Sequence, residues 1–147
     1  MRIKRMKIAV TVCQAAFILI LFLPVAKDFG SAAALSTVDL ARRYAEIGYG
    51  AGAAFYLASA TLGPAAAALF AWLLRAARKG FGMAACLSAY TELVHVCFYS
   101  ALKTALAGSV RLTGTYLFIC LFVLFGMFVC IRAYLLAAAP RHSSRKP

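Results

Sequence analysis

Residues 115–136 read TYLFICLFVLFGMFVCIRAYLL, and this stretch indicates the class of the protein. Its only charged residue is Arg132. Because about 20 apolar helical residues cross the hydrocarbon core of a bilayer, the stretch predicts a membrane-spanning helix. The whole chain agrees, since 65% of its 147 residues are hydrophobic and 14% are charged, with a mean hydropathy of +0.87. Such a composition excludes an ordinary water-soluble domain.

Three further apolar stretches lie upstream, at about residues 8–26, 47–74 and 81–106. Together with 115–136 they predict an all-α integral membrane protein, an antiparallel four-helix transmembrane bundle that forms a single membrane domain over residues 1–147. The parts outside the spans are an outer loop at 27–46, a cytoplasmic turn at 75–80 and a cytoplasmic tail at 137–147.

Lysine and arginine residues gather on one side of this predicted bundle. The leader contributes Arg2, Lys4, Arg5 and Lys7, the turn contributes Arg75, Arg78 and Lys79, and the tail contributes Arg141, Arg145 and Lys146. Basic residues that flank membrane spans favour the cytoplasmic side. We therefore expect a multi-pass protein of the cell membrane with both termini in the cytoplasm (N-in, C-in).

The first apolar stretch has an alternative interpretation. A basic leader followed by an apolar run is also typical of a secretory signal peptide, and the small residues near 30–34 could hold its cleavage site. The run is longer than the roughly 7–15 apolar residues of a signal peptide. This favours a retained helix, although both interpretations place the following residues outside.

The outer loop contains the beginning of a helix. Ser36 or Thr37 is suited to be the N-cap, and Asp39 would lie near the positive end of the helix dipole. The sequence therefore predicts a short interfacial helix here or an extension of the second span.

Charge and cysteine content exclude other classes. The net charge of +12 comes from basic residues clustered between apolar spans, without the basic face or motif of a nucleic-acid-binding protein, so we expect no nucleic-acid partner. All five cysteines lie inside apolar stretches and none forms a C-x-x-C pair. We expect neither a disulfide framework nor a zinc site.

Small residues recur along the second stretch. The positions predicted to serve helix packing are Gly48, Gly52, Ser59 and Gly63. Small side chains let two membrane helices approach closely. The alternative is a hinge at Gly63 and Pro64, because a proline inside a helix removes a hydrogen bond; the spacing of four favours packing.

The third stretch carries a polar stripe and is the candidate for a specific function. Its members share one helical face and are Ser88, Glu92, His95, Tyr99 and Lys103. Glu92 lies about eleven residues into the span, roughly 16 Å deep and close to the bilayer midplane. An ionisable group at that depth should face the bundle interior, a water-filled cavity or a partner chain.

Four interpretations of this stripe compete. It could join helices or contact a partner, it could pass protons or cations between Glu92 and His95, it could bind a metal ion, or His95 could act as a catalytic base. A metal site would need carboxylates from other spans, which the chain lacks. No nucleophile motif supports catalysis.

We expect a non-enzymatic, small polytopic membrane protein that acts through helix contacts with itself or a partner in the lipid bilayer. The alternative function is a small oligomeric transporter or proton or cation conductor that uses Glu92 and His95. We expect no cofactor and no metal ion.

Overall fold

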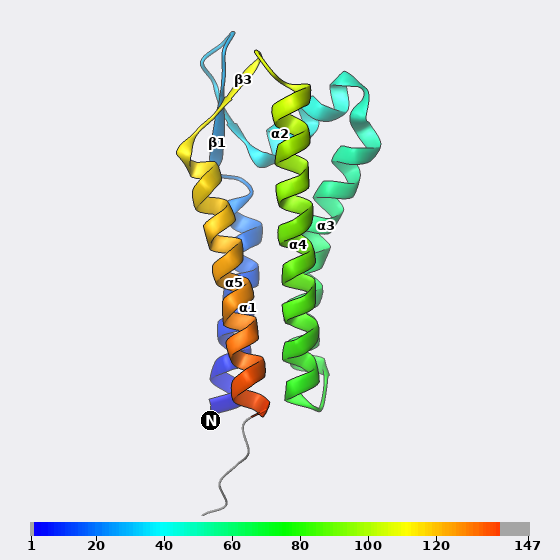
Figure 1. Cartoon of the computed structure of the whole chain (residues 1–147), viewed down its shortest axis with the longest axis vertical. Coiled ribbons are helices and arrows are strands. Elements are labelled where there is room, and N and C mark those ends of the chain that lie inside the picture. The colour runs from blue at the N-terminus through cyan, green and yellow to red at the C-terminus, as the bar shows by residue number, and fades with distance from the viewer. Residues whose placement is uncertain (1, 139–147) are drawn as a thin grey trace, which may run out of the picture.

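The computed structural model describes residues 2–138, and most of it consists of four helices that pack side by side (Figure 1). They are α1 (Arg2–Ile20), α3 (Gly50–Leu73), α4 (Ala77–Ala105) and α5 (Gly114–Ala138). Neighbouring helices pack in the ring order α1, α3, α4, α5. Arg2 and the end of α5 lie at the same end of the molecule (Figure 1).

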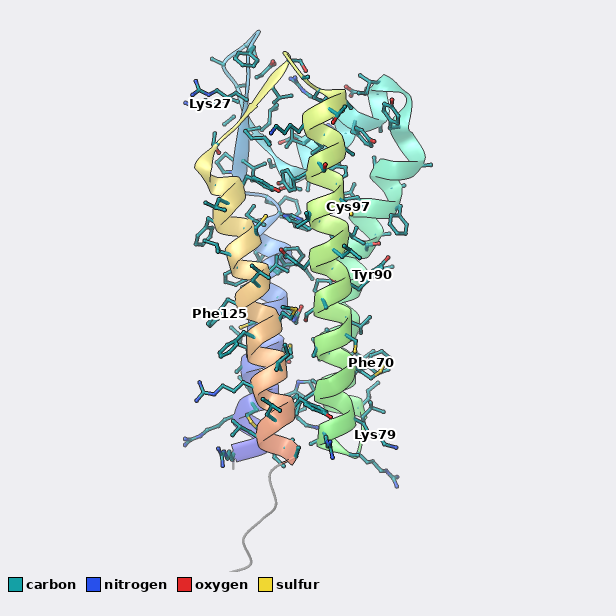
Figure 2. The ribbon with its side chains drawn as sticks, in the orientation of Figure 1. Lys27, Phe70, Lys79, Tyr90, Cys97 and Phe125 are labelled. Atoms are coloured by element: carbon teal, nitrogen blue, oxygen red, sulfur yellow. The ribbon has the colours of Figure 1, made fainter. Side chains whose placement is uncertain are left out.

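Three helices are long and apolar enough to cross a membrane: Thr37–Leu73, Ala77–Ala105 and Gly114–Ala138. Their outer surfaces carry large apolar side chains such as Leu62, Leu93 and Leu117, which are 61–68% exposed. Phe125 lies on this outer surface, while Lys27 and Lys79 mark opposite ends (Figure 2). Apolar surface of this extent suits hydrocarbon and not water. The chain is thus a multi-pass membrane protein by the length and composition of these helices.

The first of these helices has a composite start. A short helix α2 (Thr37–Tyr44) continues through a π-helical turn η1 (Ala45–Tyr49) into α3. The N-cap prediction is confirmed at Ser36: its side chain accepts a hydrogen bond from the Asp39 backbone N–H, and the Asp39 carboxylate accepts one from the Ser36 N–H. The turn breaks at Gly48, whose φ of 104° favours glycine.

The first apolar stretch is helical only in part. We expected a span over about 8–26, but α1 ends at Ile20 and Pro24 begins a strand. Pro24 lacks the N–H that a helix interior uses and disfavours helical geometry in Leu23, so the helix stops before it. The uncharged part of α1, Ile8–Ile20, is shorter than the about 20 residues of a typical span.

A small sheet corrects the all-α prediction. Its three antiparallel strands lie in the order β2-β1-β3: β1 (Pro24–Asp28), β2 (Ala34–Ser36) and β3 (Val110–Leu112). In the register, Ala26 faces Leu35 on one side and Leu112 on the other. The Thr113 N–H and hydroxyl both donate to Val25 O, which fastens the start of α5 to β1. The sheet caps the end of the bundle opposite Arg2 (Figure 1).

Helices α3 and α4 approach each other closely. A Cβ added at Gly63 would lie 2.5 Å from the Thr91 Oγ1, and one at Gly80 would lie 2.7 Å from the Phe70 carbonyl oxygen. Both distances are too short for a real Cβ, so these contacts require glycine. Helix α3 continues unbroken through Gly63 and Pro64. The interior along this seam is small and tight, with Ala60, Ala67 and Ala71 fully buried.

Candidate functional site: the polar face of α4

Helix α4 turns most of its polar stripe into the bundle. The side chains of Ser88, His95 and Tyr99 are no more than 2% exposed, whereas Glu92 is half-buried and Lys103 is exposed. Their spacing along α4 explains this arrangement, because steps of three and four residues keep side chains on one helical face. The stripe therefore begins in the core and leaves it at the sheet end.

Ser88 joins three helices. Its hydroxyl accepts a hydrogen bond from the Gln14 amide of α1 at 2.8 Å and donates one to the Ala84 carbonyl at 2.9 Å. The Cys130 sulfur of α5 lies 3.7 Å from both the Ser88 oxygen and the Gln14 nitrogen. Gln14 is itself buried. In an apolar interior these polar atoms would be costly to leave unpaired, so the cluster helps to fix which helices meet.

His95 lies at the centre of an aromatic cluster. Its Nδ1 is 2.9 Å from the Tyr56 hydroxyl of α3. Phe17 of α1 and Tyr99 pack edge-on against its ring, with centroid distances of 5.8 Å and 4.7 Å. Its Nε2 is buried and has no hydrogen-bond partner among residues 2–138. His95 thus ties α4 to α3 with one nitrogen and leaves the other free for a second contact.

Tyr99 connects α4 to the sheet end of the bundle. Its hydroxyl is 2.8 Å from the Thr37 Oγ1, and Thr37 is the first residue of α2. Its ring also lies against Tyr116 of α5, at a centroid distance of 4.0 Å. Both Thr37 and Tyr99 are buried. This hydrogen bond positions α2 across the top of the bundle.

Glu92 differs from its neighbours on the stripe. Within the described part of the chain its Oε2 is buried without a hydrogen-bond partner. The carboxylate is within electrostatic reach of Tyr116 and Cys120 on α5, so it lies at the seam between α4 and α5. Glu92 and His95 do not hydrogen-bond each other: His95 Nδ1 lies against the Tyr56 hydroxyl, and neither His95 Nε2 nor Glu92 Oε2 has a partner within residues 2–138. Glu92 and His95 thus each keep one unpaired buried atom in the described residues, but His95 makes one hydrogen bond there and Glu92 makes none.

Lys103 lies away from the buried cluster. It is exposed near the end of α4 and borders a hollow of about 240 Å³ that Arg111 and Phe29 also line. The stripe is therefore not a single site: its buried members make separate contacts to α1, α3 and α2, and Lys103 belongs to the sheet end.

The candidate packing residues of α3 and η1 have different surroundings. Gly63 contacts Thr91 of α4, and the Ser59 hydroxyl is 3.0 Å from the Tyr90 hydroxyl. Gly52 faces the Tyr44 ring, whereas a Cβ at Gly48 would meet nothing within 4 Å. Gly63 and Ser59 lie in the interface of α3 and α4. Gly48 has no packing contact of this kind; glycine suits this position because its φ is positive.

The partners of the stripe are Gln14, Thr37 and Tyr56. Tyr56 is a partner that the sequence suggests, because it lies on the second span at a depth comparable with that of the stripe, whereas Thr37 was expected only as a helix cap. The sequence did indicate a hydrogen-bond partner for Gln14, because a lone amide in an apolar stretch needs one. Tyr90 of α4 bonds Ser59 of α3 and no member of the stripe. The sequence did not indicate a contact for Tyr90, because this residue lies on the far side of the helical wheel from the stripe.

Metal-binding chemistry finds no support in the arrangement of side chains. Within residues 2–138, no group of three or more His, Cys, Asp or Glu side chains lies close enough to hold a metal ion. The cysteines are free thiols, of which Cys130 alone is fully buried.

The acids outside the spans serve the sheet end. Asp28 of β1 accepts a hydrogen bond from Arg43 of α2 at 2.8 Å, an ion pair, and one from the Ser31 hydroxyl at 2.8 Å. The Arg43 guanidinium, helped by Ser31 and the Gly30 N–H, holds the pKa of Asp28 well below its ordinary value. The Asp39 carboxylate accepts hydrogen bonds from the Ser36 N–H and hydroxyl. These contacts join the β1–β2 turn to α2.

Comparisons with protein-family models, with curated proteins and with solved structures find no match to this chain.

Proposed function

We propose that this protein crosses the membrane four times and acts, without catalysing a reaction, by binding another membrane-spanning chain, either a second copy or a partner, at the seam of α4 and α5 around Glu92. The observation that carries the proposal is the half-buried Glu92 carboxylate, whose Oε2 has no partner within residues 2–138. A carboxylate near the middle of a span is costly against lipid. Glu92 is only half-buried, so the exposed part of its side chain can accept a hydrogen bond from a second chain, while Oε2 itself is enclosed by this chain.

The other stripe residues support this interpretation. Ser88, His95 and Tyr99 already use hydrogen bonds to hold the bundle together. Glu92 makes no such bond to the other helices in the described chain, which leaves it available for a contact outside the bundle. The uncharged part of α1 is shorter than a typical span, but the Lys and Arg distribution and the common end of Arg2 and α5 (Figure 1) support a fourth crossing by α1, with both termini in the cytoplasm.

The test measures association of the purified full chain in nanodiscs. The variants are Glu92→Leu, Glu92→Gln and, as a matched control, Glu46→Leu, which removes an exposed acid at the sheet end. We expect Glu92→Leu to reduce self-association or co-purification with a membrane partner, Glu92→Gln to retain part of it, and Glu46→Leu to retain all of it. A chain that is monomeric and brings no membrane protein with it would contradict the proposal.

A specific observation also favours the second candidate, a proton or cation conductor. Glu92 Oε2 and His95 Nε2 are both buried and unpaired in residues 2–138 and lie one helical turn apart. Liposomes with a pH gradient would measure flux through the wild type, Glu92→Gln and His95→Gln. Flux that is lost in both variants supports conduction. Absence of flux in the wild type excludes it and leaves the contact role.

A further inference from the structure

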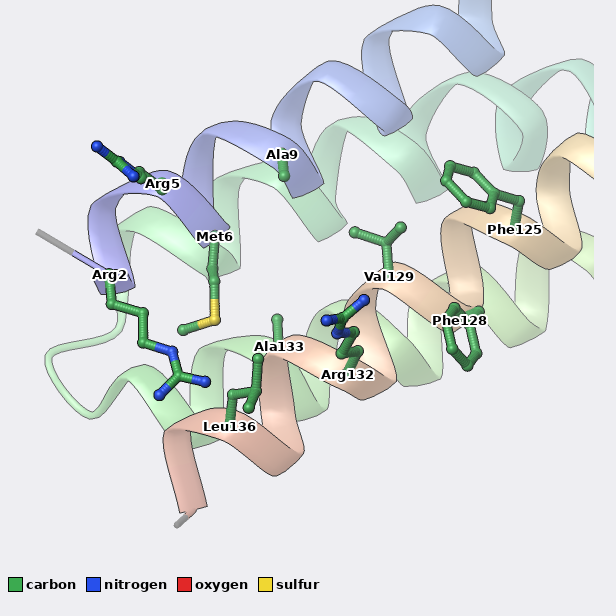
Figure 3. Close-up of a pocket in the computed structure, with 10 residues that line it drawn as sticks. All are labelled: Arg2, Arg5, Met6, Ala9, Phe125, Phe128, Val129, Arg132, Ala133 and Leu136. Carbon is green, nitrogen blue, oxygen red and sulfur yellow. The ribbon is translucent and has the colours of Figure 1, made fainter. Parts of the chain in front are cut away.

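A groove between α1 and α5 lies at the end of the molecule where both helices carry arginines (Figure 3). Its volume is about 650 Å³. Met6 and Ala9 of α1 and Val129 and Leu136 of α5 form apolar walls. A groove of this size between two membrane helices can hold part of a lipid molecule.

The mouth of the groove is strongly basic. Arg2 and Arg5 from α1 and Arg132 from α5 line it, and Figure 3 shows Arg2 and Arg132 approaching it from the two helices while Arg5 points away. The four acids of the whole sequence all lie elsewhere: Asp28, Asp39, Glu46 and Glu92. The arginines therefore have no acidic counter-charge at the groove from this chain.

The groove continues into the membrane as an apolar path. A second hollow of about 500 Å³ shares Ala9, Phe125 and Val129 with it and extends past Ile8 and Val12. Beyond Arg5, the residues along this path are apolar or the neutral Cys13. A basic mouth followed by an open apolar groove matches a molecule with an anionic head and a hydrocarbon tail.

Arg132 is suited to bind an anion at the groove. It lies six residues before Ala138, the last residue of α5, which places it about 9 Å inside the end of that helix. A guanidinium that far into a span is stabilised by an anion or by reaching the interface. Arginine also binds phosphate oxygens in a bidentate geometry.

We propose that this groove binds one anionic phospholipid, with its phosphate between Arg2 and Arg132 and an acyl chain along the path past Val12 and Phe125. The inference does not depend on the contact role of Glu92, which lies at a different seam. Basic pockets between membrane helices bind anionic head groups in this way.

The test titrates the detergent-solubilised full chain with phosphatidylglycerol or phosphatidylcholine and counts bound lipids by native mass spectrometry. We expect one phosphatidylglycerol to bind in preference to phosphatidylcholine. The double variant Arg2→Gln/Arg132→Gln should bind phosphatidylglycerol at least about tenfold more weakly. The matched control Arg75→Gln/Lys79→Gln removes two exposed charges at the same end, outside the groove, and should bind like the wild type.

A second pair of variants tests the acyl path. Val12→Trp should fill the hollow and displace the lipid, whereas Leu62→Trp, on the outer surface of α3, should not. Circular dichroism confirms that each variant is folded. Equal binding of the two lipids, equal loss in the arginine variant and its control, full binding by Val12→Trp, or a crosslink that places a second copy in the groove would each overturn the proposal.

Discussion

The Tyr56 hydroxyl and the His95 imidazole show what a single residue contributes in this bundle. Both side chains are fully buried, and their 2.9 Å contact satisfies one ring nitrogen of His95. An interhelical hydrogen bond in a membrane protein contributes about 0.6 kcal/mol on average and up to about 1.7 kcal/mol. This contact should lie toward the upper value, because removing the hydroxyl leaves both nitrogens of a buried imidazole unpaired.

We therefore expect Tyr56→Phe to lower the free energy of unfolding by about 1.5 kcal/mol in a titration of mixed micelles with a denaturing detergent. The control is Tyr90→Phe, which also removes a hydroxyl bonded to α3, but from a side chain that is 41% exposed. Tyr90→Phe should lower the free energy of unfolding by less than Tyr56→Phe does. Equal losses for the two variants would show that burial of His95 does not increase the value of its hydrogen bond.

At the scale of elements, the closest contact is the seam between α3 and α4. The short distance from a Cβ at Gly63 to the Thr91 Oγ1 means that a larger residue on α3 would force Thr91 to move or the two helices to separate. The sequence identified this position from its spacing, yet the contact with Thr91 depends on the rotation of α4 about its axis. Periodicity gives the face of a helix that packs, but not the residue opposite it.

We expect Gly63→Ala to lower the free energy of unfolding by about 1–3 kcal/mol through overpacking. Adding Thr91→Ala should recover most of that loss, because it removes the oxygen that the new methyl group meets. Gly126→Ala is the control: Gly126 is also buried in a helix, but a Cβ there meets nothing within 4 Å. If Thr91→Ala did not recover the stability lost in Gly63→Ala, the close approach of α3 and α4 at these two residues would be contradicted.

The ion pair of Arg43 and Asp28 fastens the β1–β2 turn to α2 and should respond to pH. Since the pKa of Asp28 is lowered in the folded protein, its stabilisation is fully present above the ordinary Asp pKa of about 3.9 and is lost as pH falls below it. The difference in unfolding free energy between wild type and Asp28→Asn should thus be constant above about pH 5 and shrink in acid. If the difference in unfolding free energy grew as the pH fell, the pKa of Asp28 would not be lowered in the folded protein.

At the scale of the whole molecule, the two ends differ in charge. The acids Asp28, Asp39 and Glu46 belong to the sheet end, and Lys79 lies at the opposite end (Figure 2). Composition was sufficient to predict the three long apolar helices, because hydrophobicity over about 20 residues depends on no other part of the chain. It could not predict the sheet: β3 has three residues and pairs with a strand from the other half of the sequence.

We expect the sheet end to lie outside and the basic end in the cytoplasm. In a cysteine-free background, Ser31→Cys should react with a membrane-impermeant maleimide on intact cells, whereas Lys79→Cys and Lys4→Cys should react only after permeabilisation. All three positions are exposed. Reaction of both Ser31→Cys and Lys4→Cys on intact cells would show that α1 does not cross the membrane.

The pairing of β1 with β3 has a consequence for the order in which the protein is made. Strand β1 ends at Asp28 and β3 begins at Val110, and the helices from α2 to α4 lie between them along the chain. When β1 emerges from the ribosome, the strand that will complete its hydrogen bonds has not been synthesised. The sheet can close only after β3 has reached the same side of the membrane. Its formation therefore marks the point at which all helices before α5 have been placed.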